Sequence, residues 1–175
     1  MHRTRLTTLF LCAALLPVLA WAADGYDDGD KLPEDKGVLM FKVVREKQQG
    51  GAVVRRGAWQ LEMRTASGKR LMVGNPTKLK AFLVEPGRYF FYALRQIEGG
   101  TEYTGMSGPS EALVVEAGKV SWAGTIHLEP GASGTRIYTE QGAEAKAELL
   151  DKFPDAVKAG IVQRVDLGAA PVPLE

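Results

Sequence analysis

The sequence predicts one domain of the all-β class, an antiparallel β-sandwich of about seven to eight strands with one short C-terminal amphipathic helix. Two observations predict this fold. Short runs alternate apolar and polar residues, which is the period of a half-buried strand, and Gly or Pro interrupts these runs about every ten residues. A single late segment changes to helical spacing. We expect the sandwich to span residues 37–168, with its helix near 141–153.

The chain begins with the three zones of a secretory signal peptide, which we assign to residues 1–22. Arg3 and Arg5 precede an apolar run from Leu9 to Leu19, and Ala20-Trp21-Ala22 supplies the small residues of a cleavage site. The run is shorter than the roughly 20 residues that a membrane span needs. The alternative is an uncleaved N-terminal anchor. We predict that the protein is periplasmic and has no transmembrane segment after cleavage. An acidic flexible leader is expected at residues 23–36, directly after the signal peptide.

Cleavage changes what the chain can do. Removing 22 of the 175 residues leaves 153, with 20 basic and 21 acidic side chains, enough for one domain with a sizeable core. Cys12, the single cysteine, leaves with the signal peptide. The remaining chain can form neither an internal disulfide nor a thiolate metal site.

Alternation assigns the strands. We expect three sets to face inward: Leu39, Phe41 and Val43; Trp59, Leu61 and Met63; and Val120, Trp122, Gly124, Ile126 and Leu128. Residues 89–94 are apolar on both faces, as in a central strand, and Ile161, Val165 and Leu167 form the last strand.

Turns and the helix complete the pattern. Residues 85–88 favour a type II turn, 98–101 a hairpin, and 46–57 a mobile loop. Ala145, Leu149, Leu150 and Phe153 recur at helical spacing, and Pro154 is expected to end the helix. Residues 169–175 form an extended tail, either disordered or docked.

Catalytic chemistry is poorly supported. His127, the only histidine after cleavage, is expected to point to solvent beside Thr125 and Glu129, and Ser107 lacks the strand-to-helix context of a nucleophile elbow. The acidic start only partly matches a calcium loop. We predict no catalytic residues, no cofactor, no metal and no nucleic-acid binding.

Charge is distributed unevenly along the chain. Residues 42–95 contain twelve basic side chains and three acidic ones, Glu46, Glu62 and Glu85. Neighbouring strands of opposite charge could neutralise this surplus locally, or it could form a basic face for an anionic partner. The candidates for that face are Arg55, Arg56, Arg64, Lys69 and Arg70.

Two segments carry a family resemblance. Ala81-Phe82-Leu83-Val84-Glu85-Pro86-Gly87-Arg88-Tyr89 resembles the Pro-Gly-x-Tyr hairpin of carboxypeptidase-regulatory-like, or transthyretin-like, domains. Residues 115–126, with the later Phe153-Pro154, are similar to segments of small Gram-negative envelope proteins. The resemblance implies a transthyretin-like sandwich with a role in adhesion, stabilisation or assembly and no active site.

The function predicted is therefore non-catalytic: a periplasmic β-sandwich that binds a protein or an anionic cell-envelope component. One alternative is an inhibitor or immunity-type protein that presents the loop at 46–57 to a periplasmic enzyme. The other is a hydrolase, which the shortage of catalytic residues disfavours. The sequence gives no oligomeric state.

Overall fold

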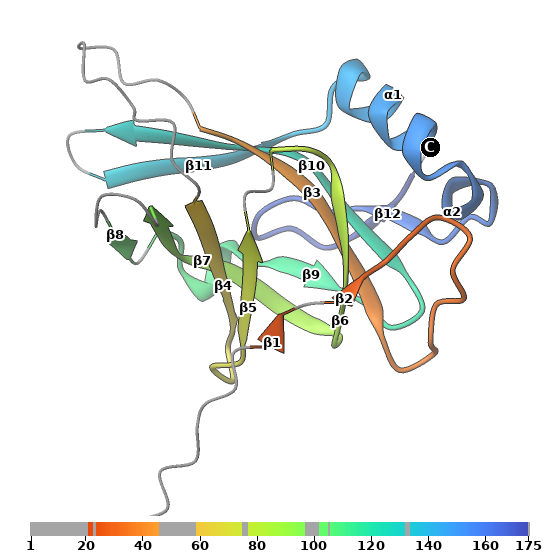
Figure 1. Ribbon diagram of the computed structural model, residues 1–175, viewed down its shortest axis with the longest axis horizontal. Helices are drawn as coiled ribbons and strands as arrows, with labels where there is room; N and C mark the ends of the chain where they lie inside the picture. Colours follow the sequence, from red (N-terminus) through yellow and green to blue (C-terminus); the bar gives the residue numbers. More distant parts are fainter. Residues whose placement is uncertain are drawn as a thin grey trace, which may run out of the picture.

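The computed structural model describes residues 21–22, 24–45, 59–74, 77–96, 102–104, 106–131 and 134–174. Strands predominate in these residues and form two sheets, and two α-helices lie together at one end (Figure 1). The prediction of a mostly β chain with a late helix is confirmed. Neither helix is long and apolar enough to cross a membrane, as far as the described residues go.

The first sheet, called sheet A, has the strand order β1-β5-β4-β7-β8, and β9 also pairs with β7. Its strands are β1 (Trp21–Ala22), β4 (Trp59–Thr65), β5 (Arg70–Gly74), β7 (Gly87–Gln96), β8 (Glu102–Thr104) and β9 (Leu113–Val115). β4 and β5 form a hairpin whose turn contains Gly68 at a φ of +83°. β7 is central in this sheet, as its apolar sequence predicts.

The second sheet, called sheet B, has the order β13-β12-β10-β3-β6-β2, and β11 also pairs with β10. Its strands are β2 (Asp24–Gly25), β3 (Gly37–Arg45), β6 (Lys80–Val84), β10 (Val120–Gly131), β11 (Gly134–Glu140), β12 (Val162–Arg164) and β13 (Val172–Pro173). β10 runs parallel to both β3 and β12, so the prediction of a wholly antiparallel arrangement is wrong. The long connection through sheet A lets β10 return in the same direction as β3.

The turn at 85–88 joins β6 of sheet B to β7 of sheet A, so it transfers the chain between sheets. The Tyr89 hydroxyl donates a hydrogen bond to the Glu85 carbonyl across this turn, at 2.8 Å. Burial raises the pKa of Tyr89 to about 12. The predicted turn at 98–101 and the predicted loop at 46–57 lie outside the described residues.

Two apolar clusters hold the layers together. The larger lies between the sheets and includes Leu39, Phe41, Leu61, Met63 and Phe91. The predicted inward positions are therefore confirmed for β3 and for Leu61 and Met63 of β4, while the side chain of Trp59 lies outside what the structure describes. The smaller lies between the opposite face of sheet B and the helices. Its members include the following buried side chains: Val38, Met40, Val120, Trp122, Ala145, Leu149, Phe153 and Ala156. β3 is therefore covered on both faces.

A β-bulge in β10 corrects the predicted face of that strand. The register against β3 shifts between Trp122 and Gly124, and Gly124 has a φ of +71°. Trp122 consequently packs under the helices, whereas Ile126 and Leu128 pack between the sheets. The sequence prediction placed all of them on one face because an inserted residue is invisible to a strict period of two.

The helical segment continues past the predicted end. α1 (Ala143–Lys152) matches the expected helix, but α2 (Pro154–Lys158) follows directly. Pro154 begins α2 instead of ending the helical region. A proline is tolerated at the first position of a helix because the N–H group that it lacks would have no hydrogen-bond partner within the helix there. A 3-10 turn, η1 (Pro109–Glu111), precedes β9.

Both ends of the described chain contact the domain. Tyr26 is buried, and the Asp28 carboxylate accepts hydrogen bonds from the backbone N–H groups of Asp155 and Ala156, at 2.9 and 3.0 Å. These are free donors of the first turn of α2, so Asp28 caps that helix from a distant part of the chain. The segment assigned to a flexible leader is held at these points. In the tail, β13 pairs with β12.

Candidate functional site

The outer face of sheet A brings together a buried carboxylate and three arginines, here called the Glu62 cluster: Glu62, Arg64, Arg70 and Arg95. Glu62 lies on β4 between Met72 of β5 and Ala93 of β7, and it points away from the core. It is nevertheless completely buried. A charged side chain in such a position needs hydrogen-bonded counter-charges.

The arginines supply them. Arg64 Nε donates to Glu62 Oε1 at 2.7 Å, and Arg95 Nη2 donates to Glu62 Oε2 at 2.9 Å. Arg70 Nε lies 3.6 Å from Oε1, which is an ion-pair distance without a hydrogen bond. Each carboxylate oxygen thus has a guanidinium donor, and a third guanidinium lies beside them.

Tyr92 fixes Arg64 from the other side. The register between β4 and β7 shifts at Glu62 and Met63, and Tyr92 is the extra residue of that bulge. The Arg64 guanidinium lies over the Tyr92 ring, 3.2 Å from its centroid, in a cation–π contact. Arg64 is therefore held by a hydrogen bond along its edge and by an aromatic ring at its face.

The cluster carries a surplus of positive charge that faces solvent. Three guanidinium groups oppose one carboxylate, and the side chains of Arg64, Arg70 and Arg95 are 22, 41 and 42% exposed. Among the described residues, neither the terminal amines of Arg64 nor the guanidinium nitrogens of Arg70 donate a hydrogen bond to a protein acceptor. Guanidinium forks of this kind match carboxylate and phosphate oxygens.

Comparison of the chain with protein-family models, with curated proteins and with solved structures found no match. We therefore interpret the candidate site from its geometry alone.

The predicted basic residues fall into three groups. Arg64 and Arg70 meet in the Glu62 cluster, while Arg55 and Arg56 lie outside the described residues. Lys69 instead pairs with Glu85, which Lys36 also approaches at 3.8 Å. The hydrogen bond from Lys69 lowers the pKa of Glu85. Lys69 is thus already neutralised by a partner outside the cluster.

Sequence reasoning missed three members of the site. Alternation with the inward Leu61 and Met63 puts Glu62 on the outward side of β4, and nothing in the local sequence shows that it would be buried there. Arg95 lies on a different strand, and Tyr92 reaches Arg64 only because of a bulge. The detectable signal was the outward pair Glu62 and Arg64 at a spacing of two, which places both on one face of a strand.

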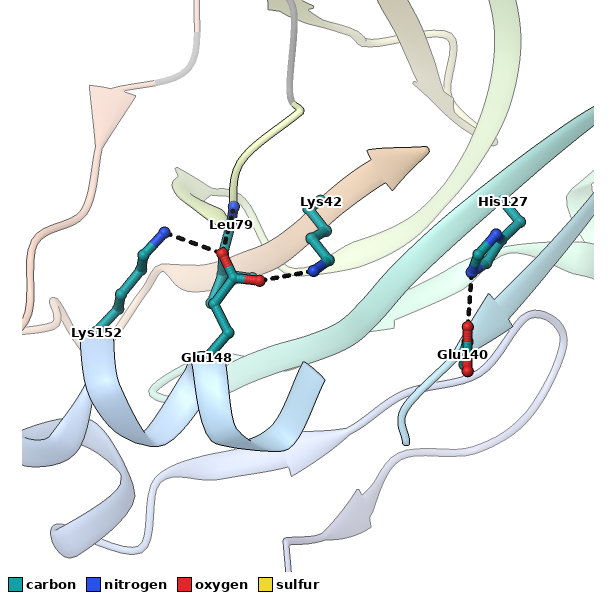
Figure 2. A network of polar contacts seen from close by, with 6 residues as sticks. All are labelled: Lys42, Leu79, His127, Glu140, Glu148 and Lys152. Atoms are coloured by element: carbon teal, nitrogen blue, oxygen red, sulfur yellow. Dashed lines mark hydrogen bonds and ion pairs between the residues drawn. The ribbon is translucent and has the colours of Figure 1, made fainter. Parts of the chain in front are cut away.

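A second polar network links α1 to sheet B (Figure 2). Glu148 accepts hydrogen bonds from Lys42 on β3 at 2.8 Å and from Lys152 at 2.9 Å, and it is 3.4 Å from the Leu79 backbone nitrogen. Burial raises the pKa of Glu148, but the hydrogen bonds from the lysines and from Leu79 outweigh it and bring the pKa to about 2. This network fastens the helix to the sheet.

His127 is less exposed than predicted. It points to the outer face of sheet B, as alternation requires, but its side chain is only 12% exposed. Its Nε2 is 2.9 Å from a Glu140 carboxylate oxygen (Figure 2), and its ring stacks on Tyr138 with centroids 4.7 Å apart. Tyr138 and Glu140 both come from β11, so His127 joins β10 to that strand.

The sites that the sequence disfavoured gain no geometric support. Ser107 bonds to the backbone of Phe91 on sheet A, whereas His127 belongs to sheet B, so the two are not a pair. Asp28, within the partial calcium-loop match, caps α2. In the described part of the chain, no three His, Cys, Asp or Glu side chains are grouped as a metal site.

Proposed function

We propose that this chain is a non-catalytic periplasmic protein with a transthyretin-like sandwich, and that it binds a protein or an anionic envelope component through the Glu62 cluster. The fold proposal is supported by two sheets that share one apolar core. Export is supported by the three-zone leader at residues 1–22. The observation that carries the binding proposal is the convergence of three arginines on one buried carboxylate.

The cluster is better suited to binding than to stabilising the fold. A buried ion pair contributes little net stability, because desolvation of the charges offsets most of their attraction. Burying Glu62 instead holds guanidinium groups in place before a ligand arrives. A ligand oxyanion then meets ordered donors and a positive field, which reduces the entropy lost on binding.

Charge reversal of Arg70 tests the proposal. Arg70 makes no hydrogen bond to Glu62, so Arg70→Glu removes a partly exposed guanidinium without removing either hydrogen bond to the buried carboxylate. We expect the exported variant to lose at least about tenfold in retention on envelope fractions at low salt, because the three guanidinium groups against one carboxylate become two against two and the local surplus of positive charge is lost. Arg64→Lys keeps the charge but loses the planar fork, and we expect it to bind more weakly than the unmodified protein.

Arg136→Glu is the matched control. Arg136 lies on β11 of sheet B, is 74% exposed, and changes the net charge of the protein by the same amount. Equal loss of retention in Arg136→Glu and Arg70→Glu would show a response to net charge alone. Unchanged retention of Arg70→Glu would remove the Glu62 cluster as the binding face.

A further inference from the structure

β1 occupies the outer edge of sheet A beside the Glu62 cluster. Trp21 pairs with Leu71 and Ala22 with Met72, and the two strands run parallel (Figure 1). This short strand is the end of the predicted signal peptide. β5 therefore has an edge that accepts an extended chain segment, and here it holds the chain's own leader.

The backbone groups at that edge can be identified from the β4–β5 hairpin. The Thr65 N–H donates to the Lys69 carbonyl, at 3.0 Å. Thr65 and Lys69 are therefore a hydrogen-bonded pair of the hairpin. Hydrogen-bonded and non-hydrogen-bonded pairs alternate along an antiparallel ladder, so Leu71 and Val73, two and four residues after Lys69, also direct their backbone groups to β4. Arg70, Met72 and Gly74 direct theirs to the edge.

Cleavage after Ala22 would open this edge. The predicted site lies between β1 and β2, and β2 pairs with β6 in the other sheet. A cut there removes β1 and leaves Asp24 paired with Leu83. The processed chain keeps its sheet B pairing. Among the described residues, the backbone groups of Arg70 and Met72 at the β5 edge then lose their strand partner, while the Gly74 carbonyl accepts a hydrogen bond from Lys80 Nζ at 3.3 Å.

The same edge borders the Glu62 cluster. Arg70 and Met72 occupy the outward positions of β5, opposite Arg64 and Glu62 of β4. Consider a peptide segment that takes the place of β1 in the same register. Its residue opposite Met72 would project onto the outer face of sheet A, and so would its residue two positions earlier, opposite Arg70. A carboxylate at either position would meet the arginines.

We propose that the β5 edge of the processed chain docks an extended, acidic segment of a partner protein. The segment adds a parallel strand to sheet A and places alternate Asp or Glu side chains against Arg70 and Arg64. This inference rests on the proposed function, and it names the partner as a protein. Main-chain pairing supplies affinity, and the arginine face supplies selection for acidic residues.

Two other occupants of the β5 edge, a second copy of this chain and an anionic polysaccharide, fit less well. A second copy joined edge to edge would bring together two faces that each carry a surplus of positive charge. An anionic polysaccharide would meet the arginines but would have no peptide groups to pair with the edge. β1, the occupant present in the structure, is itself an extended peptide segment.

Labelled octapeptides test the inference. The full-length gene is expressed, the exported protein is purified, and its N-terminus is determined by mass spectrometry. Fluorescence anisotropy then compares an alternating Val-Asp octapeptide with its Val-Asn counterpart. We expect the Val-Asp peptide to bind at least about tenfold more tightly, because both form strands and only one carries carboxylates.

N-methylation separates edge pairing from charge attraction. In the register of β1, segment residues opposite Leu71 direct their N–H groups to β5, and residues opposite Met72 direct theirs away. Methylation of the valine nitrogens should weaken binding at least about tenfold, and methylation of the aspartate nitrogens should leave it within about twofold. Equal binding of the two methylated peptides would overturn the edge inference.

A protein variant gives the reciprocal test. Met72→Pro removes an edge N–H without removing a bond to β4, and Met72→Leu is its control. We expect Met72→Pro to lose the peptide but to keep heparin, used as an anionic polymer, while Arg70→Glu loses both. Because the methylated peptides use unmodified protein, they decide the inference even if Met72→Pro fails to fold.

The outcomes distinguish the two proposals. Arg70-dependent heparin binding without peptide binding would overturn the protein partner and leave the proposed anionic face intact. Loss of neither ligand in Arg70→Glu would overturn both. An exported protein that still contains Trp21 and Ala22 would also overturn the inference, since β1 would then keep the edge closed.

Discussion

Replacing the buried carboxylate of Glu62 by an amide tests the role of this residue in holding the arginines. Glu62→Gln keeps the shape of the side chain, but its amide oxygen can accept from only one of Arg64 and Arg95, and its NH2 group then faces the other guanidinium, donor against donor. Hydrogen bonds to charged groups contribute about 1.5–3 kcal/mol each, and breaking a buried ion pair costs about 3–5 kcal/mol. Because the three arginines are 22–42% exposed, water can solvate them in the variant. We therefore expect a loss of about 2–3 kcal/mol in the free energy of unfolding.

For a chain of this size the loss corresponds to a fall in Tm of about 5–10 °C. Urea unfolding should show a lower midpoint with an unchanged slope. Glu129→Gln is the control, since Glu129 also accepts from an arginine and a tyrosine, Arg136 and Tyr138, but is 37% exposed. We expect at most about 0.5 kcal/mol there. A Tm for Glu62→Gln within about 1 °C of the control variant would refute the idea that Glu62 anchors the cluster.

Three further substitutions, with Gly74→Ala as a control, probe sheet B and its helices. Gly124→Ala should cost about 3 kcal/mol or more, measured by thermal unfolding, because its φ is +71° and a Cβ would overlap the Glu140 carbonyl oxygen. Gly74→Ala, which has open space around it, should change Tm little. Asp28→Ala should cost about 1 kcal/mol through loss of the α2 cap, and similar stability of Asp28→Ala and the parent protein would contradict that role. The pKa of Glu148 falls from 4.5 to about 2 on folding, so its contribution to stability is complete above about pH 4.5 and is lost as the pH falls toward 2. Glu148→Gln should therefore flatten the pH dependence of stability in that window, and an unchanged slope would show that other carboxyls dominate it.

Local patterns predicted local structure well. Alternation identified the inward residues of β3 and β4, and helical spacing located α1. The errors came from interactions between distant segments. The parallel pairing of β3 with β10 depends on how the chain returns from sheet A. Pro154 begins α2, and that helix is capped by Asp28, which is far away in the sequence. The spacing of apolar residues, every second residue in a strand or every 3.6 residues in a helix, contains no information about these long-range contacts.

The candidate site shows the same division. Alternation placed Arg64 on an outward face, and its position relative to Glu62 follows from a spacing of two on one strand. Arg95 joins them through the register of β7, and the bulge that turns Tyr92 toward Arg64 is one extra residue in that strand. The sequence therefore offered a basic face as one of two alternatives, the other being local neutralisation, and it did not predict that Arg64 and Arg70 meet around a carboxylate.

Comparison of Glu62 with Glu148 indicates why only the first is proposed as a binding site. Both carboxylates are mostly buried and accept hydrogen bonds from two basic side chains. Glu148 belongs to α1 and bonds to β3, so its network lies where a helix meets a sheet, and both α-helices of the described chain pack on sheet B. Glu62 lies on sheet A, where the arginines themselves form the outer layer and the ends of two guanidinium groups remain without protein acceptors in the described residues. The first network is completed by the fold, whereas the second leaves directed donors for a ligand.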